Sequence, residues 1–169
     1  MKTKLLFALR ITLIVCIICT LSFTFYQSSL SKESSTEQSD KVGGFLGEIF
    51  PPDTPTGEFV QENVREIAHY TEFFFLGLFV SLYVCLFLPG VRAEMPSRIK
   101  FALLSLVISP IIPLVDETIQ IFSDRGPEIA DIWLDIFGYL SSSVIVYLIF
   151  FTGSCLVCRH KAANNKTAD

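Results

Sequence analysis

The chain has 169 residues, of which 51% are hydrophobic and 18% charged, and sixteen are Phe. A composition this apolar argues against a soluble domain and indicates a polytopic membrane protein. The length leaves room for one compact bundle, so residues 1–169 are expected to form a single membrane domain. The formal net charge of −4 predicts little, because the placement of charges matters more than their sum in a membrane protein. Nucleic acid is not an expected partner.

Uncharged runs mark the transmembrane segments. They cover residues 11–30, 73–91, 101–115 and 136–157, and a spanning helix needs roughly 20 apolar residues. The third run is short, but Ile119, Ile121 and Phe122 extend it past an acidic pair. The first run is too long for a signal peptide and no A-x-A-like site follows, so an uncleaved helix is expected. We therefore predict an all-α fold with four transmembrane helices.

The segment after the first helix divides into two parts. The stretch "SSLSKESSTEQSD" is polar and is predicted to be a flexible loop. Five apolar residues then follow at the spacing of one helix face: Val42, Phe45, Leu46, Ile49 and Phe50. Pro51 and Pro52 should end this short helix. It is expected either to lie in the outer membrane interface or to pack back on the bundle.

The later segments complete the predicted bundle. Residues 56–79 are expected to form one continuous helix that begins in water and enters the bilayer. A short loop with Pro-Gly precedes the third span, and "SDRGPEIADIW" forms a tight turn in which Pro127 suits the first position of the fourth helix. Residues 161–169 are expected to be a disordered cytoplasmic tail.

The distribution of basic residues predicts the orientation. Nine of the thirteen Lys and Arg residues flank one end of the helices, and four lie on the other side: Lys32, Lys41, Arg65 and Arg125. The positive-inside rule then places both termini in the cytoplasm. Of the seventeen acidic residues, only Glu94 and Asp169 fall on that side.

Three of the predicted helices carry polar residues at helical spacing near one membrane face. The second carries Arg65, His69 and Glu72, the third carries Asp116, Glu117 and Gln120, and the fourth carries Asp131, Asp135 and Gly138. Since consecutive spans alternate in direction, these stripes should meet on the outer side. No H-E-x-x-H or comparable ligand spacing is present, so neither a metal nor another cofactor is predicted.

The acidic residues outnumber the basic residues at this predicted meeting point. Charged side chains in a bilayer turn inward and pair with one another. Five carboxylates face only Arg65, Arg125 and a protonated His69, so some of them must be protonated, hydrated or neutralised by a bound cation or a cationic ligand. This excess predicts a pocket that binds a ligand.

The same residues resemble a known family. "REIAHYTEFFFLGLF" is similar to the R-K-x-x-H-x-x-E-Y/F-x-x-L-G helix of VanZ-like membrane proteins, and "DETIQIFSDRGPEIADIWLDIFG" resembles their D-E-x-x-Q-x-F and D-x-x-x-N-x-x-G signature. The resemblance spans about residues 65–142. It departs at Glu66, where a basic residue is usual, and at Asp135, where Asn is usual, and the spacing from Phe122 to Arg125 is one residue short.

The resemblance implies an integral protein of a bacterial cytoplasmic membrane, in a family named for a protein of glycopeptide-resistance clusters and linked to low-level teicoplanin resistance. We expect a pocket open to the outer leaflet, with His69, Asp116 and Glu117 at its core and Arg65 and Arg125 as counter-charges. Its candidate ligands are a lipid-linked wall precursor, a lipoglycopeptide or an amine-bearing headgroup. The alternatives are an intramembrane enzyme acting on lipid-linked intermediates, a small transporter and a purely structural polar network.

Overall fold

The computed structural model describes residues 2–88, 94–123 and 128–166, and every regular element within those ranges is an α-helix. In chain order the helices are α1 (Lys2–Ser28), α2 (Lys32–Ile49), α3 (Pro55–Glu62), α4 (Val64–Leu86), α5 (Met95–Ile108), α6 (Ile111–Phe122) and α7 (Ile129–Lys166). Four helical stretches are long and apolar enough to cross a membrane: Thr3–Ser28, Val64–Leu86, Met95–Phe122 and Ile129–Leu156. The predicted all-α fold with four transmembrane helices is confirmed.

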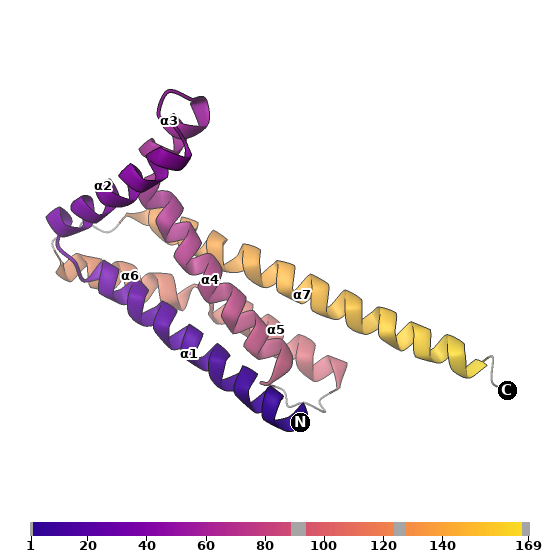
Figure 1. The fold of residues 1–169 in the computed structure, drawn as a ribbon. Coiled ribbons are helices and arrows are strands. Elements are labelled where there is room, and N and C mark those ends of the chain that lie inside the picture. Colours follow the sequence, from indigo (N-terminus) through magenta and orange to yellow (C-terminus); the bar gives the residue numbers. More distant parts are fainter. Residues whose placement is uncertain (1, 89–93, 124–127, 167–169) are drawn as a thin grey trace.

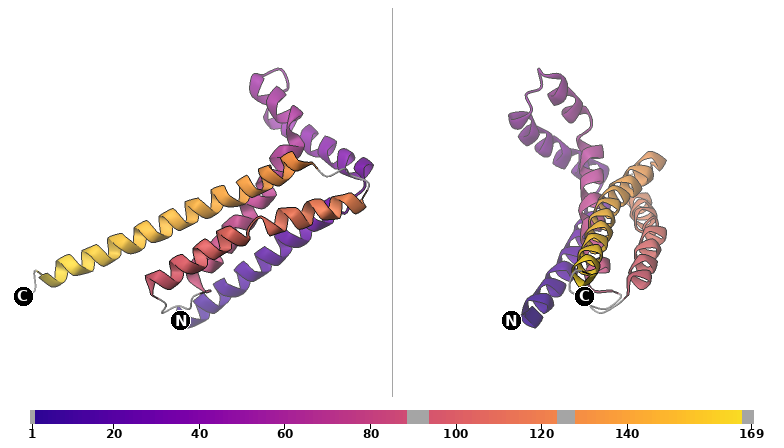
Figure 2. Two further views of the ribbon diagram at one scale, coloured as in Figure 1. Left: turned by 180° about the vertical axis from the view of Figure 1, so that it is seen from behind. Right: turned by 90° about the vertical axis from the view of Figure 1, so that its right-hand side faces the viewer.

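The four spans run side by side, and α2 and α3 form a hairpin at the end where α1 finishes and α4 begins (Figure 1). The two other views keep this hairpin at the same end of the bundle (Figure 2). Helix α4 is central, because it contacts α1, α5 and α7. Helix α2 lies across the end of the bundle and also contacts α3 and α4, an orientation that suits the predicted interfacial helix.

Two glycines allow α4 and α7 to approach closely. A Cβ atom added at Gly77 would lie 2.4 Å from the carbonyl oxygen of Tyr139, and one added at Gly138 would lie 2.5 Å from that of Tyr70. Small residues at such crossings let helix backbones touch, and this contact replaces the hydrophobic effect that is missing between helices in lipid. Gly138, predicted as a site residue, therefore serves the packing of α7 on α4.

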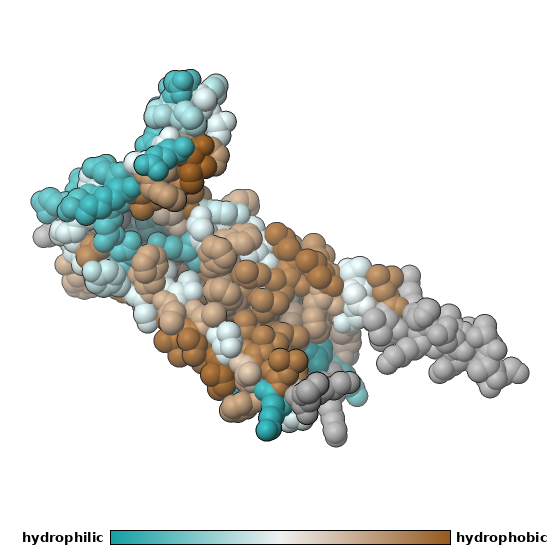
Figure 3. Space-filling model, viewed as in Figure 1, coloured by the Kyte–Doolittle hydropathy of each residue, from teal (hydrophilic) through white to brown (hydrophobic). Residues whose placement is uncertain are grey.

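The apolar surface matches a membrane environment. Brown, apolar residues cover the length of the bundle in Figure 3, whereas hydrophilic residues gather on the α2–α3 hairpin. Inside, one apolar cluster surrounds Phe73, Leu76 and Tyr139, and a second surrounds Val84, Val146 and other residues towards the opposite end. The first cluster lies beside the polar residues along α4 and α7, since Phe73 follows Glu72 and Tyr139 lies one turn beyond Asp135.

Helix α2 is longer than predicted. The polar stretch expected to be a flexible loop is helical from Lys32 onward. Ser31 caps this helix by accepting a hydrogen bond from the Ser34 amide, and Glu33 lies in the first turn, where the helix dipole favours an acid. Lys41 forms an i,i+4 salt bridge of 2.7 Å with Glu37 and lowers the pKa of that carboxyl. These local contacts stabilise a helix that hydrophobicity does not reveal.

Two predicted helices are each divided in the structure. The helix expected over residues 56–79 is broken at Asn63, whose φ of −118° and ψ of 28° separate α3 from α4. The third span bends between α5 and α6 at Ser109 and Pro110, because proline lacks the amide hydrogen that a continuous helix needs. Helix α7 ends at Lys166, within the predicted C-terminal tail. The predicted position of Pro127 falls outside the described residues.

Candidate functional site

The acidic residues of α6 bind to the ends of two neighbouring helices. Ser28, the last residue of α1, donates a hydrogen bond of 2.6 Å to Asp116, and both residues are buried. Glu117 accepts a 3.0 Å hydrogen bond from the amide of Glu128, which directly precedes α7. The side-chain amide of Gln120 donates to both carboxylates, at 3.3 Å to Asp116 and 2.8 Å to Glu117. The second half of the third span is therefore fixed to α1 and α7 by charge-assisted hydrogen bonds.

Arg65 joins the start of α4 to the start of α7. Its guanidinium lies 2.8 Å from the Asp131 carboxylate and 3.7 Å from that of Glu128. The Asp131 side chain is only 7% exposed, whereas the Arg65 side chain is 35% exposed. The guanidinium thus neutralises the buried Asp131 carboxylate, while part of the Arg65 side chain stays exposed.

His69 and Asp135 lie one turn deeper. Nδ1 of His69 is 3.4 Å from a carboxylate oxygen of Asp135, and Asp135 is fully buried. Within the described part of the chain, neither Asp135 oxygen nor His69 Nδ1 makes a hydrogen bond. Buried polar groups nearly always have partners, so this pair is the least satisfied part of the network.

A polar pocket of about 420 Å³ opens between α1, α2 and α4. Ten of its fourteen lining residues carry a polar group: Tyr26, Gln27, Ser28, Ser35, Gln38, Ser39, Lys41, Arg65, His69 and Glu72. Two basic residues, Lys41 and Arg65, face it together with one carboxylate, Glu72. The lining can therefore hold a charged or hydrogen-bonding group.

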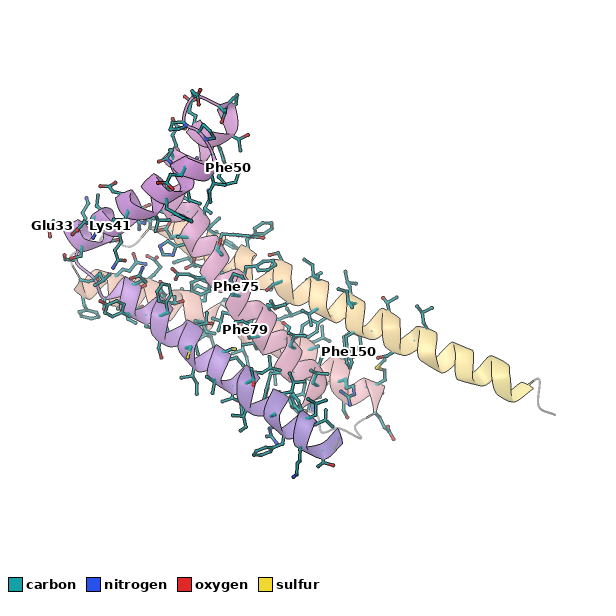
Figure 4. The ribbon with its side chains drawn as sticks, in the orientation of Figure 1. Glu33, Lys41, Phe50, Phe75, Phe79 and Phe150 are labelled. Carbon is teal, nitrogen blue, oxygen red and sulfur yellow. The ribbon has the colours of Figure 1, made fainter. Side chains whose placement is uncertain are left out.

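An apolar groove of about 630 Å³ adjoins this polar pocket. The two share six lining residues: Phe23, Gln27, Val42, Val64, Ala68 and Glu72. Beyond them the groove continues along α4 past Ile67, Phe75 and Phe79. Figure 4 shows Lys41 on the hairpin side and Phe75 and Phe79 further along the bundle, so the lining changes from polar to apolar along α4.

The match to a family model decides where this chain belongs. A model described as VanZ/LLP1 matches residues 12–151, most of the 169 residues. The chain belongs to the VanZ/LLP1 family. No curated protein and no solved structure matches it. Family membership and four spanning helices together make it a multi-pass membrane protein.

The polar residues predicted for this VanZ/LLP1 protein separate into two groups. Arg65, His69 and Glu72 line the polar pocket. The other five side chains are buried among the helices behind it: Asp116, Glu117, Gln120, Asp131 and Asp135. Helical spacing thus identified side chains that lie close together, although it did not distinguish those facing the pocket. Arg125, the predicted second counter-charge, lies outside the described residues.

Sequence reasoning missed the contribution of α1 and α2 to this VanZ/LLP1 site. Thr24 and Ser28 are buried beside the acids, and four polar residues of α2 cover the pocket. A signal for α1 was present, because Thr20, Thr24, Gln27 and Ser28 follow one another at helical spacing within an apolar run. No comparable signal marked α2, since its polar residues also suit a loop.

Proposed function

We propose that this VanZ/LLP1 protein binds a lipid-linked cell-envelope molecule at the outer face of a bacterial cytoplasmic membrane. The main support for this binding is that the polar pocket continues into an apolar groove. An amphiphile needs such an arrangement, with polar contacts for its headgroup and apolar surface for its chain. The excess of Lys and Arg at the opposite end of the helices supports the outward orientation and cytoplasmic termini.

The charges of the polar pocket favour an anionic headgroup. The excess of carboxylates in the sequence favoured a cation among the candidate ligands, but only Glu72 among those carboxylates lines the pocket. Lys41 and Arg65 face the same space, and Arg65 retains partial exposure despite its pair with Asp131. Guanidinium and ammonium groups are the usual protein ligands of phosphate. A polyprenyl phosphate-linked wall precursor is therefore the preferred ligand class.

A polyprenyl phosphate carrying a photoreactive group would test this proposal in proteoliposomes. Ala68 lines both cavities and is exposed, so Ala68→Trp should block their junction without disturbing the core. We expect strong crosslinking to the wild type, a loss of about tenfold in Ala68→Trp, and no loss in Ala8→Trp on the exposed face of α1. Equal crosslinking of all three proteins would reject the site.

Competition identifies the headgroup. Unlabelled polyprenyl phosphate disaccharide should reduce the crosslinking, whereas phosphatidylethanolamine should not. Displacement by the amine lipid alone would contradict the anionic assignment, and displacement by teicoplanin alone would identify a lipoglycopeptide site.

Glycopeptide resistance is a separate part of the proposal. Expression of the wild type in a susceptible Gram-positive host should raise the inhibitory concentration of teicoplanin, because an occupied pocket changes the supply or display of the drug's lipid-linked target. Ala68→Trp should abolish the increase, while Ala8→Trp keeps it. An unchanged inhibitory concentration with well-expressed wild type would disprove resistance for this protein, and the binding proposal would stand on the crosslinking alone.

A further inference from the structure

We propose that His69, Asp116 and Asp135 form a binding site for a divalent metal ion. Each residue offers one ligand atom, and the three atoms lie within 4.8 Å of one another. They come from three helices, α4, α6 and α7, and all three residues are buried. Atoms at this spacing are near enough to share one ion, for which nitrogen and oxygen ligands require metal–ligand distances of about 2.0–2.2 Å.

Buried polar atoms that make no hydrogen bond among the described residues support the metal site independently. Asp135 is fully buried, and neither of its oxygens accepts a hydrogen bond within the described residues. Nδ1 of His69 is also without a hydrogen bond there. A buried carboxylate that accepts no hydrogen bond is costly, and coordination of a metal is one of the few arrangements that satisfies it.

The charges at this point favour a doubly charged cation. Among the described residues Asp135 has only His69 as an ion-pair partner, and the two ligand carboxylates together carry up to two negative charges. Arg65 is engaged by Asp131 and Glu128 instead. A divalent ion would balance both carboxylates and leave His69 neutral, which is the form in which imidazole binds metals.

Asp116 accepts hydrogen bonds from neighbouring side chains, as the ligands of protein metal sites usually do. Ser28 donates to one of its oxygens and Gln120 to the other, which fixes the orientation of the carboxylate. Hydrogen bonds of this kind hold ligands in place around protein metal sites.

The ligand types select the class of metal. One imidazole nitrogen with two carboxylates suits Zn²⁺ or Mn²⁺, whereas Ca²⁺ and Mg²⁺ prefer sites built from oxygen alone. Three protein ligands leave a coordination position for water or another molecule, as in catalytic zinc sites. Because His69 also lines the polar pocket, this metal site would supply what the intramembrane-enzyme alternative requires. The metal proposal does not depend on the identity of the pocket's ligand.

Manganese binding to the purified full-length protein tests the site directly. Electron paramagnetic resonance of Mn²⁺ distinguishes free from bound ion, and Mn²⁺ avoids the cysteine thiols that could bind Zn²⁺ elsewhere in the chain. We expect saturable binding of about one ion per chain, competition by Zn²⁺, and a higher melting temperature that EDTA reverses. Absence of saturable binding to folded wild type would overturn the proposal.

Substitutions locate the bound ion. Asp135→Asn and His69→Gln should each weaken Mn²⁺ binding by at least about tenfold. Asp40→Asn, the same change at an exposed position of α2, should leave it unchanged. If the site variants fold and bind Mn²⁺ as tightly as the wild type, the ion lies elsewhere and the proposed site is wrong. If they do not fold, the wild-type titration still decides whether any ion binds, and Asp116→Asn provides the third position to localise it.

Discussion

Single side chains in this protein act mainly by joining helices. Ser28 connects α1 to α6, and Arg65 connects α4 to α7. Each contact satisfies a carboxylate that is removed from water, so the loss of a partner should cost more than the loss of an ordinary surface contact. The stability of the bundle and the geometry of the candidate site therefore depend on the same few atoms.

Ser28→Ala should destabilise the protein. The change removes the 2.6 Å hydrogen bond to Asp116, and bonds to charged groups contribute about 1.5–3 kcal/mol. We expect a lower melting temperature in detergent. Ser29→Ala is the matched control, because Ser29 is exposed and its hydroxyl, among the described residues, donates to the nearby Tyr26 carbonyl. Equal melting temperatures for the two variants would contradict the assigned role of Ser28.

A double-mutant cycle measures the pairing of Arg65 with Asp131. Arg65→Gln leaves a nearly buried Asp131 without its partner, so the single change should cost more than it does when Asp131→Asn is already present. We expect a coupling energy of about 1–2 kcal/mol in denaturant titrations. The exposed Lys41–Glu37 pair should give a much smaller coupling. Additive effects of the two substitutions would show that the ion pair contributes nothing to stability.

At the scale of helices, the bundle depends on the contact between α4 and α7, and this contact depends on two glycines. Gly77 and Gly138 both face backbone atoms of the partner helix, and Gly77 also faces the Ser142 hydroxyl. A backbone cannot move aside locally, so any larger residue must separate the helices. Separation would also displace Asp135 from His69, since these residues lie on the same pair of helices.

Gly77→Ala and Gly138→Ala should each destabilise the fold. Their added Cβ atoms would lie 2.4 Å and 2.5 Å from carbonyl oxygens, and overpacking of this kind costs about 1–3 kcal/mol. Gly153→Ala is the control, because a Cβ atom at that position of α7 meets nothing within 4 Å. Alanine favours a helix over glycine, so the control should have an unchanged or higher melting temperature. Three equal melting temperatures would show that the crossing tolerates a wider separation.

The sequence predicted most accurately the elements whose positions are determined by hydrophobicity. The four spans follow from uncharged runs because backbone groups in lipid must bond within the helix itself. The proximity of Arg65 to Asp131 and of His69 to Asp135 follows from helical spacing and alternating direction. The extension of α2, the break at Asn63 and the bend at Pro110 arise from local capping and backbone geometry that hydrophobicity does not record. The hydrogen bond from Ser28 to Asp116 was missed because Ser28 is uncharged, and the helical spacing of the polar residues of α1 was its signal in the sequence.

At the scale of the whole molecule, hydrophilic and apolar residues occupy different parts of the long axis. The α2–α3 hairpin forms a hydrophilic end, and apolar residues cover the spans below it (Figure 3). The polar pocket lies beside the hairpin, so its access depends on which side of the membrane the hairpin occupies. Orientation is thus the property that connects this fold to the proposed envelope ligand.

Reporter fusions test that orientation. Alkaline phosphatase is active only outside the cytoplasm, so we expect an active enzyme when it is inserted after Asp53 and an inactive one when it is fused after Asp169. A fluorescent protein fused after Asp169 should be bright in the same cells. The reverse pattern would place the polar pocket in the cytoplasm and remove the basis for binding an outer-leaflet ligand.

The hydrogen bond between Ser28 and Asp116 has a consequence for communication between the two proposed sites. Ser28 ends α1, and α2, which covers the polar pocket, begins only four residues later at Lys32. A cation that reorients Asp116 would therefore shift Ser28 and, through the short connection, helix α2. A lipid bound in the polar pocket would contact α2 and would in turn shift Ser28 and Asp116. Thermodynamic linkage requires the two effects to be equal, so Mn²⁺ should change the affinity for the polyprenyl phosphate by the same factor as the lipid changes the affinity for Mn²⁺.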